Sequence, residues 1–164
     1  MIKIYHNPEC GTSRNVLAVF KAAGYEVQVI EYLHVGWERE QLTYLLNAAN
    51  LSPRQALRTS KSPAAELGLL DEAVSNETIF EMMLKHPILV NRPIVCIPQD
   101  EYEHSASLTE KLKKGKTVSN NLKETVKLCR PSEVVLDILP IWPQGPFAKE
   151  DGTPLIDQYG RRVI

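Results

Sequence analysis

The sequence is short of long apolar runs and has almost no net charge. Within its 164 residues, no window approaches the ~18 consecutive apolar residues that a membrane-spanning helix needs. Its first residues lack the basic start and the apolar stretch of about 7–15 residues typical of a signal peptide. The net charge of −1 provides no overall attraction to nucleic acid or an anionic membrane. We therefore expect a cytoplasmic protein with no nucleic-acid or membrane partner, in which any anion is recognised locally.

Cysteine is scarce, and its arrangement excludes several kinds of chemistry. The three cysteines (Cys10, Cys96 and Cys129) are an odd number at wide spacings, unlike a secreted disulfide framework. The third residue after Cys10 is Ser13, so there is no CxxC pair. The sixth is Val16, so the Cys-x5-Arg loop of phosphatases is absent too.

Motifs for bound cofactors and metals are also missing. There is no G-x-G-x-x-G for a dinucleotide. His34, His86 and His104 have no ligand-like spacing relative to the cysteines. We expect neither a metal nor a bound cofactor, so any redox chemistry here requires an external reductant.

Hydrophobic periodicity predicts an α/β chain of one domain, residues 1–164. Strands are expected at Ile2–Tyr5 and Glu26–Leu33, with a later pair at Ile88–Val90 and Ile94–Ile97. Helices are expected from a cap at Thr12 or Ser13 to Gly24, and at Trp37–Asn50, Pro53–Arg58, Ser75–Lys85 and Pro131–Leu139. The tail after Pro140 is rich in proline and glycine and should be mostly loop, with a short strand near Phe147 and a turn at Asp151-Gly152.

The polar stretch from Pro98 to Lys127 differs from its surroundings. It carries many lysines and almost no large aliphatic residues. Charge runs are usually solvated surface, so a solvated excursion with a frayed helix is the favoured interpretation. A partner-binding arm is the alternative.

Cys10 lies where a thiolate is most strongly stabilised, on a loop between a strand and a helix N-terminus. Unpaired backbone N–H groups and the helix dipole favour negative charge there, and such positions lower a thiol pKa from near 8.5 to about 3.5–7.5. The hydroxyl of Ser13 can donate to the sulfur, and Gly11 permits a close approach of the chain. We interpret Cys10 as a reactive thiol rather than a small buried hydrophobe.

The other candidates near this thiol have more than one interpretation. His6 either favours the thiolate electrostatically or is an ordinary loop histidine. Cys96, within an apolar run, is expected to pack in the core. Cys129 precedes Arg130, a cation that could activate it, yet nothing else in the sequence supports a second nucleophile.

The order of several short motifs resembles the glutaredoxin-dependent arsenate reductases of the ArsC type, which have a thioredoxin-like fold. The resemblance covers most of the chain, to about Ile97 and again from Leu128. Its motifs are Tyr5-His6-Asn7-Pro8-Glu9-Cys10-Gly11-Thr12-Ser13-Arg14-Asn15, Leu57-Arg58, Glu66-Leu67-Gly68-Leu69, His86-Pro87-Ile88-Leu89-Val90-Asn91-Arg92-Pro93-Ile94-Val95 and Leu128-Cys129-Arg130-Pro131-Ser132-Glu133-Val134-Val135-Leu136-Asp137.

The resemblance implies a mixed central sheet flanked by helices and a reduction of arsenate to arsenite through a covalent Cys10–arsenic adduct. It implies glutathione as co-substrate and glutaredoxin as the reducing partner. His6 would assist thiolate formation and Ser13 would hydrogen-bond the sulfur. Pro93 would be a cis-proline facing the site.

Three arginines complete the implied site. Arg58, Arg92 and Arg130 would bind the oxyanion and lower the cysteine pKa, which suits the bidentate binding of oxyanions by guanidinium groups. Without the resemblance, Arg58 could equally be helix surface. Arg92 is a charge out of place between two apolar strands, and Arg130 stands at a helix start, where the dipole disfavours cations.

The sequence departs from the family in the polar insertion near residues 98–127, which is about two dozen residues longer than the family's connection. Two alternatives therefore stay open. One is a thioredoxin-fold regulator of the Spx kind that contacts RNA polymerase, and the other is a glutathione-dependent thiol oxidoreductase without arsenate activity.

Overall fold

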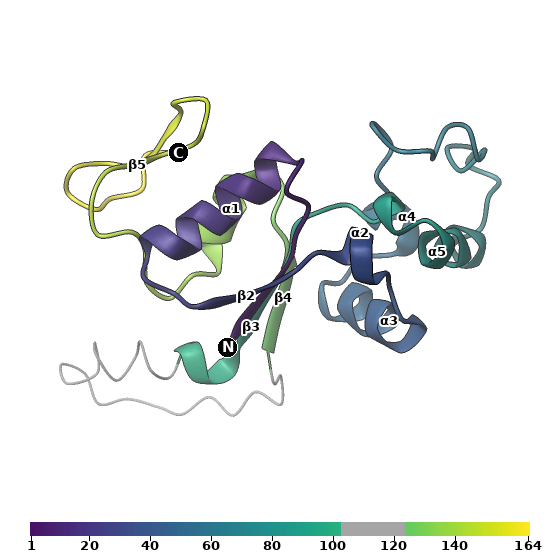
Figure 1. The fold of residues 1–164 in the computed structure, drawn as a ribbon, viewed down its shortest axis with the longest axis horizontal. Helices are drawn as coiled ribbons and strands as arrows, with labels where there is room; N and C mark the ends of the chain where they lie inside the picture. Colours follow the sequence, from purple (N-terminus) through teal and green to yellow (C-terminus); the bar gives the residue numbers. More distant parts are fainter. Residues whose placement is uncertain (103–123) are drawn as a thin grey trace.

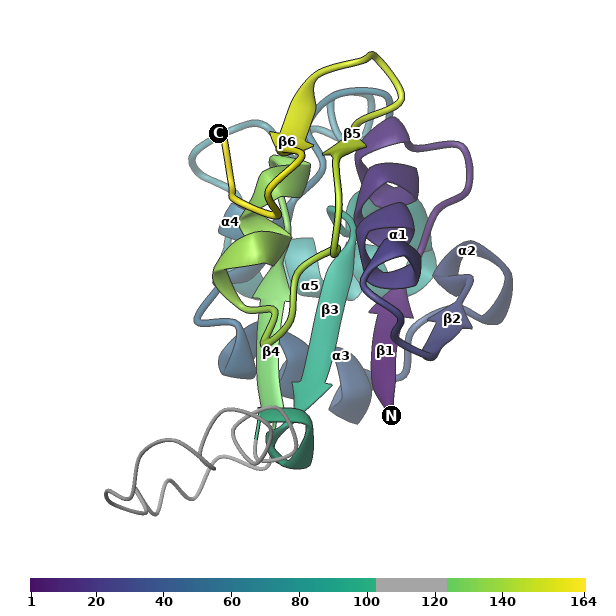
Figure 2. The same cartoon turned by 90° about the vertical axis from the view of Figure 1, so that its left-hand side faces the viewer.

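A four-stranded mixed sheet forms the centre of the protein (Figure 1; Figure 2). The structure is a computed structural model and describes residues 1–102 and 124–164. The strands are β1 (Ile2–Tyr5), β2 (Val27–Ile30), β3 (Ile94–Pro98) and β4 (Glu124–Leu128), in the order β2-β1-β3-β4. β1 and β2 are parallel, whereas β3 is antiparallel to both β1 and β4. The sheet therefore places the C-terminal end of β1 beside the start of β3.

Helix α1 (Gly11–Ala22) and the 3₁₀ helix η2 (Ser132–Asp137) cover one face of the sheet (Figure 2). Alternate side chains of a strand point to opposite faces, and Ile2, Ile4, Val95 and Ile97 point to this one. They are buried against the apolar stripe of α1 and against η2. The β1–α1–β2 unit is the parallel crossover that the first third of the sequence predicts.

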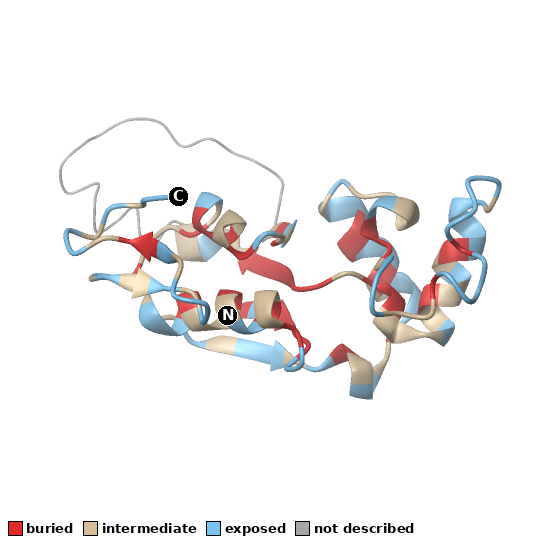
Figure 3. Ribbon diagram, turned by 90° about the horizontal axis from the view of Figure 1, so that it is seen from above, coloured by how far each residue is buried: buried red, intermediate tan, exposed pale blue. Residues whose placement is uncertain are grey.

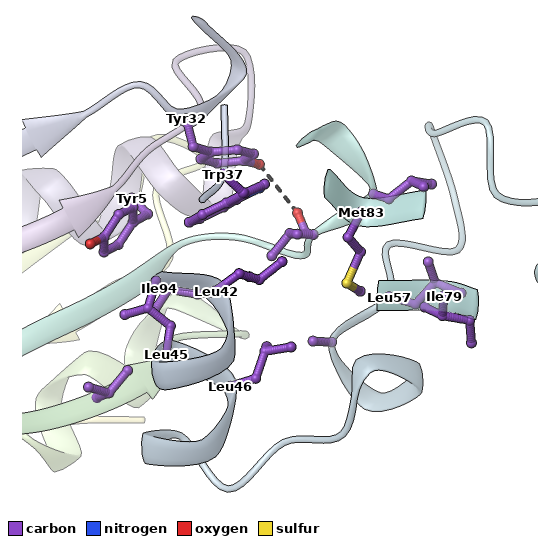
Figure 4. Close-up of a cluster of buried hydrophobic side chains, with 14 of the residues drawn as sticks. Tyr5, Tyr32, Trp37, Leu42, Leu45, Leu46, Leu57, Ile79, Met83 and Ile94 are labelled. Atoms are coloured by element: carbon purple, nitrogen blue, oxygen red, sulfur yellow. Dashed lines mark hydrogen bonds between the residues drawn. The ribbon is translucent and has the colours of Figure 1, made fainter. Parts of the chain in front are cut away.

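The other face is covered by short helices: α2 (Tyr32–Val35), α3 (Arg39–Ala48), α4 (Pro53–Ala56), α5 (Asn76–Lys85) and the 3₁₀ helix η1 (Pro87–Leu89). Leucines of α3 pack against Ile94 and Cys96 of β3, and α5 extends the same apolar cluster away from the sheet (Figure 4). Because both faces are covered, β3 is buried along almost its whole length (Figure 3).

The C-terminal tail returns to the end of the sheet at which β1 leads into α1 (Figure 2). It contains a small hairpin of β5 (Phe147–Ala148) and β6 (Pro154–Ile156). Nε of Arg14 donates to Glu150 over 2.7 Å, and Nζ of Lys149 lies 2.6 Å from Glu133. These ion pairs join the tail to α1 and to η2. The expected short strand near Phe147 is confirmed.

Several elements differ from their predicted limits because local hydrogen bonds override propensity. α1 begins at Gly11 with Cys10 as its N-cap, so the expected caps Thr12 and Ser13 lie inside the first turn. The second strand ends at Ile30, and Tyr32 belongs to helix α2. The last predicted helix is a 3₁₀ helix rather than an α-helix.

The predicted pairing of the later strands is wrong. The residues of Ile88–Val90 form the end of η1 and an isolated bridge from Val90 to Leu57, whereas the partner of β3 is β4. β4 comes from the stretch 98–127, and 99–102 are helical, so both ends of the expected polar insertion are ordered elements. The expected frayed helix and the lysine-rich part of that insertion lie outside the described residues.

The apolar cluster beyond the sheet should dominate the stability of the helical layer. Ile79 and Met83 of α5 are fully buried in this cluster. Ile79→Ala should lower the free energy of unfolding by about 2–5 kcal/mol, since it removes buried methyl groups and leaves a cavity. Chemical denaturation measures this difference. The control Leu70→Ala, at a side chain 46% exposed, should change it by less than about 0.5 kcal/mol, and equal effects of the two variants would contradict the assigned core.

Candidate functional site around Cys10

Cys10 is held at the first turn of α1 by the loop that follows β1. The backbone N–H of Cys10 donates to Asn7 over 3.0 Å, and the carbonyl of Cys10 accepts from Arg14 over 3.0 Å. The N–H of His6 donates to Ile30 over 2.8 Å, which fixes the loop to the end of β2. The side chain of Cys10 is only 7% exposed. The thiol thus lies at a helix N-terminus inside a largely enclosed site.

Opposing effects determine the acidity of this thiol. Burial raises the pKa of Cys10, but the backbone N–H of Ser13 and the guanidinium groups of Arg130 and Arg92 lower it more, so the pKa falls to about 7. Nη1 of Arg130 lies 3.6 Å from the sulfur. A large share of the thiol is therefore ionised at neutral pH, as expected for a nucleophile at a helix N-terminus.

Ser13 and His6 lie in the loop and first turn that hold the thiol, and they contact each other. The hydroxyl of Ser13 is 2.7 Å from Nδ1 of His6 and accepts the N–H of Asn7 over 3.1 Å. It is the backbone N–H of Ser13, not its hydroxyl, that interacts with the sulfur. Burial lowers the pKa of His6, which favours the uncharged ring. Through Ser13, His6 forms a polar support under the first turn of α1.

The segments that carry Arg58 and Arg92 are joined by backbone hydrogen bonds. The N–H of Arg58 donates to Leu89 over 2.7 Å, and the N–H of Asn91 donates to Ala56 over 2.8 Å. Between these two hydrogen bonds, Leu57 and Val90 face each other as an isolated antiparallel β-bridge. Residues more than thirty positions apart are thereby placed side by side next to the thiol.

Buried guanidinium atoms of these two arginines have no partner. Nε and Nη1 of Arg92 and Nε of Arg58 are buried without a hydrogen bond to any residue in the described parts of the chain. Arg92 is only 5% exposed. Burial and the nearby Arg92 and Arg130 lower the pKa of Arg58, so the three cations lie within electrostatic reach of one another. An unpaired buried donor is costly, so this geometry calls for an anion.

The remaining arginines of the first half of the chain behave differently. Arg14 binds Glu150, Arg39 binds Glu81, and Arg54 donates to the carbonyls of Asp71 and Val74. Each guanidinium group is paired with its own acceptor, including that of Arg14, which lies in the first turn of α1 close to Cys10. The structure therefore separates Arg58, Arg92 and Arg130 from the surface arginines.

Arg130 bridges the thiol and the Arg92 segment. Its Nη1 donates to the carbonyl of Arg92 over 2.9 Å as well as approaching Cys10. The peptide bond Arg92-Pro93 is cis, as the resemblance implied for Pro93, and Arg130-Pro131 is also cis. The N–H of Cys129 donates to Pro93 over 3.0 Å, which aligns the two proline segments.

The two other thiols differ sharply from Cys10. Cys96 is 1% exposed and Cys129 is fully buried, and burial raises the pKa of each to about 12. Cys129 lies in the apolar cluster under α1, so the adjacent Arg130 does not activate it. Both thiols remain protonated at neutral pH and serve as core residues.

Tyr32 is a site residue that the sequence interpretation missed. It was assigned to a strand, yet its hydroxyl donates to the carbonyl of Val90 over 3.4 Å and its ring stacks on Trp37 at 4.9 Å (Figure 4). Burial raises its pKa to about 12. Its hydroxyl thus lies against the segment that leads to Arg92. No sequence signal marks this residue, because its burial and its contact with Val90 are visible only in the structure.

Within 1–102 and 124–164, no helix has the length and apolar character needed to cross a bilayer. No three His, Cys, Asp or Glu side chains of these ranges gather closely enough to hold a metal ion.

Comparisons with known proteins agree with this arrangement of thiol and arginines. The model of the ArsC family matches residues 5–138, which include Cys10 and all three arginines. The chain belongs to the ArsC family. It is 56% identical to "Arsenate reductase ArsI2" of Synechocystis sp. over 99% of each chain. It is 39% identical to the arsenate reductase of Escherichia coli, over 99% of this chain and 97% of that one.

A solved structure supports the same fold. The chain is similar to the arsenate reductase of Vibrio cholerae with a TM-score of 0.63 and 32% identity. The match covers 97% of that chain and 84% of this one. The fold is therefore the thioredoxin-like α/β fold of the ArsC proteins, with a four-stranded mixed sheet flanked by helices.

The acidity of Cys10 tests the site directly. Its thiolate should titrate with a pKa of about 7, and alkylation by iodoacetamide should accelerate as pH rises through this value because the thiolate is the nucleophile. Arg130→Ala removes a cation 3.6 Å from the sulfur and should raise the pKa by about one unit or more. Ultraviolet absorbance of the thiolate measures both values.

The matched control is Arg39→Ala, because Arg39 is paired with Glu81 on the surface of α3 and α5. It should leave the Cys10 pKa unchanged. A wild-type pKa near 8.5, or equal values for the two variants, would contradict the assigned electrostatics.

Proposed function

We propose that the protein reduces arsenate to arsenite, with Cys10 as the nucleophile and glutathione and glutaredoxin as the source of electrons. The observation that carries the proposal is the group of buried, unpaired guanidinium atoms of Arg58 and Arg92 beside an acidic thiol. Near neutral pH, arsenate is a tetrahedral oxyanion that accepts bidentate hydrogen bonds from guanidinium forks. Full-length relatives that are named arsenate reductases support the same activity.

The proposed roles follow from the contacts of each residue. Arg58, Arg92 and Arg130 bind the oxyanion and stabilise the Cys10 thiolate, and Nη1 of Arg130 contacts the sulfur. His6 and Ser13 hold the loop so that amide N–H groups point at the sulfur. Pro93 aligns the Arg92 segment with the segment of Cys129 and Arg130. The cations act while the site is largely closed to water, where electrostatic stabilisation is strongest.

The chemistry balances with two thiols. The Cys10 thiolate forms a sulfur–arsenic bond, and one oxygen of arsenate leaves as water. The thiolate of glutathione then forms a disulfide bond with the sulfur of Cys10, and the sulfur–arsenic bond breaks. The electron pair of that broken bond remains on arsenic, which is thereby reduced and leaves as arsenite. Glutaredoxin then reduces the mixed disulfide. An external thiol suits this chain, because Cys96 and Cys129 are buried and protonated.

The wider assignment follows from this chemistry. We propose that residues 1–164 act as one unit, since the arginines come from segments spread over the chain and meet at Cys10. A thiol with a pKa of about 7 needs a reducing compartment, so the cytoplasm is the proposed location. The regulator and the thiol oxidoreductase without arsenate activity remain the alternatives, and neither accounts for three arginines around one thiol.

Turnover of arsenate decides the function. Purified protein should consume arsenate only when glutathione and glutaredoxin are both supplied, and Cys10→Ser should abolish turnover because it removes the nucleophile. The control Cys129→Ala should retain most of the activity, since that thiol is buried away from the site. No turnover by the wild-type protein, together with binding of RNA polymerase, would favour the regulator.

Tyr32→Phe tests the support of the arginine cluster. Loss of the hydroxyl leaves the Val90 carbonyl without this donor and loosens the segment before Arg92. A hydrogen bond of this kind contributes about 0.5–1.5 kcal/mol, so KM for arsenate should rise about threefold to tenfold. The Cys10 pKa should stay at about 7. The control Tyr44→Phe removes a hydroxyl that binds Glu124 at the far end of the sheet, and it should leave KM unchanged.

A further inference from the structure

A groove is lined in part by Arg130 but not by Cys10, Arg58 or Arg92. It has a volume of about 330 Å³ and lies between the end of α3, the strand β4 and the helix η2. Its apolar walls include Leu51, Leu128 and Val134, and its polar groups are Lys127, Arg130 and Asp137. This volume falls within the range of about 300–1,000 Å³ that is usual for small-ligand sites. We call it the Arg130 groove.

The groove is adjacent to the reactive sulfur because the two share Arg130. Nη1 of Arg130 contacts Cys10 and the carbonyl of Arg92. In the described parts of the chain, Nη1 is the only nitrogen of this guanidinium with a hydrogen bond, so Nε and Nη2 can still donate. One side chain can therefore contact the thiol and a second ligand at the same time.

The charges of the groove select a particular kind of ligand. Lys127 is exposed and has no ion-pair partner among residues 1–102 and 124–164, so its ammonium can bind a carboxylate. Asp137 is paired with Arg162 of the tail, yet a carboxylate has about four acceptor positions and can also accept an ammonium. Among the lining residues, two cations and one anion give a net charge of +1 beside an apolar wall, and Arg162 adds a further positive charge next to Asp137.

Glutathione is the complementary ligand. It carries two carboxylates, one ammonium and a central thiol, with a net charge of −1. We propose that the Arg130 groove binds glutathione noncovalently, with its carboxylates at Lys127 and Arg130, and presents its thiol to Cys10. This proposal rests on the proposed function, because it places the reductant of that reaction. The thiol exchange itself is the balanced step described above.

Binding can be measured without turnover. In the Cys10→Ser protein, which cannot form a disulfide at this position, titration with reduced glutathione should shift the NMR amide signals of Lys127, Leu128 and Val134. Lys127→Glu in the same background reverses one groove charge and should weaken binding about tenfold. The control Lys85→Glu reverses an exposed charge at the end of α5, outside the groove, and should leave the affinity unchanged. 2-Mercaptoethanol, a thiol without carboxylates, should not shift these signals.

Kinetics give the second measurement. In the protein with Cys10 intact, Lys127→Glu should raise KM for glutathione about tenfold and leave KM for arsenate nearly unchanged, whereas Lys85→Glu should change neither. Shifts confined to other surfaces, or equal effects of the two variants, would overturn the proposal. A groove that binds glutathione in a protein without arsenate turnover would instead contradict the proposed function alone.

Discussion

The site depends on holding one sulfur as an anion at a helix N-terminus. Cys10 is largely buried, and burial alone would keep the thiol protonated. The backbone N–H of Ser13 and two guanidinium groups outweigh that cost. The same fold leaves Cys96 and Cys129 buried without such donors, and their pKa values rise instead. Three thiols of one chain thus differ in acidity because of what surrounds each sulfur.

The rest of the architecture serves to bring cations to this point. Arg58 arrives from the loop after α4, Arg92 from the segment before β3, and Arg130 from the segment after β4. The bridge between Leu57 and Val90 and the bond from Arg130 to the carbonyl of Arg92 join these segments. Tyr32 and Trp37 lie beneath them and pack in the apolar cluster of the helical layer. Loss of packing in the helical layer would therefore also displace the segments that carry the arginines.

Buried donors of Arg58 and Arg92 have no hydrogen-bond partner in the described parts of the chain. Burial, together with the nearby Arg92 and Arg130, lowers the pKa of Arg58, so its positive charge is disfavoured without an anion beside it. The thiolate compensates one positive charge, and in the proposed function the oxyanion compensates the others. The Arg130 groove adjoins this cluster, because Arg130 lines the groove and also contacts Cys10.

Much of this site was determined by the sequence alone, because its cues are local. The strand, loop and helix start around Cys10 follow from patterning, and the motif order predicted the fold, the three arginines and the cis-proline at Pro93. Only the tertiary structure decided which donors reach the sulfur and that burial lowers the pKa of His6, since both depend on contacts between distant segments. It also showed that β3 pairs with β4 and not with the predicted strand at Ile88–Val90, and it revealed the buried contact of Tyr32. Strand partners and buried contacts join residues far apart in the chain, and no local pattern encodes them.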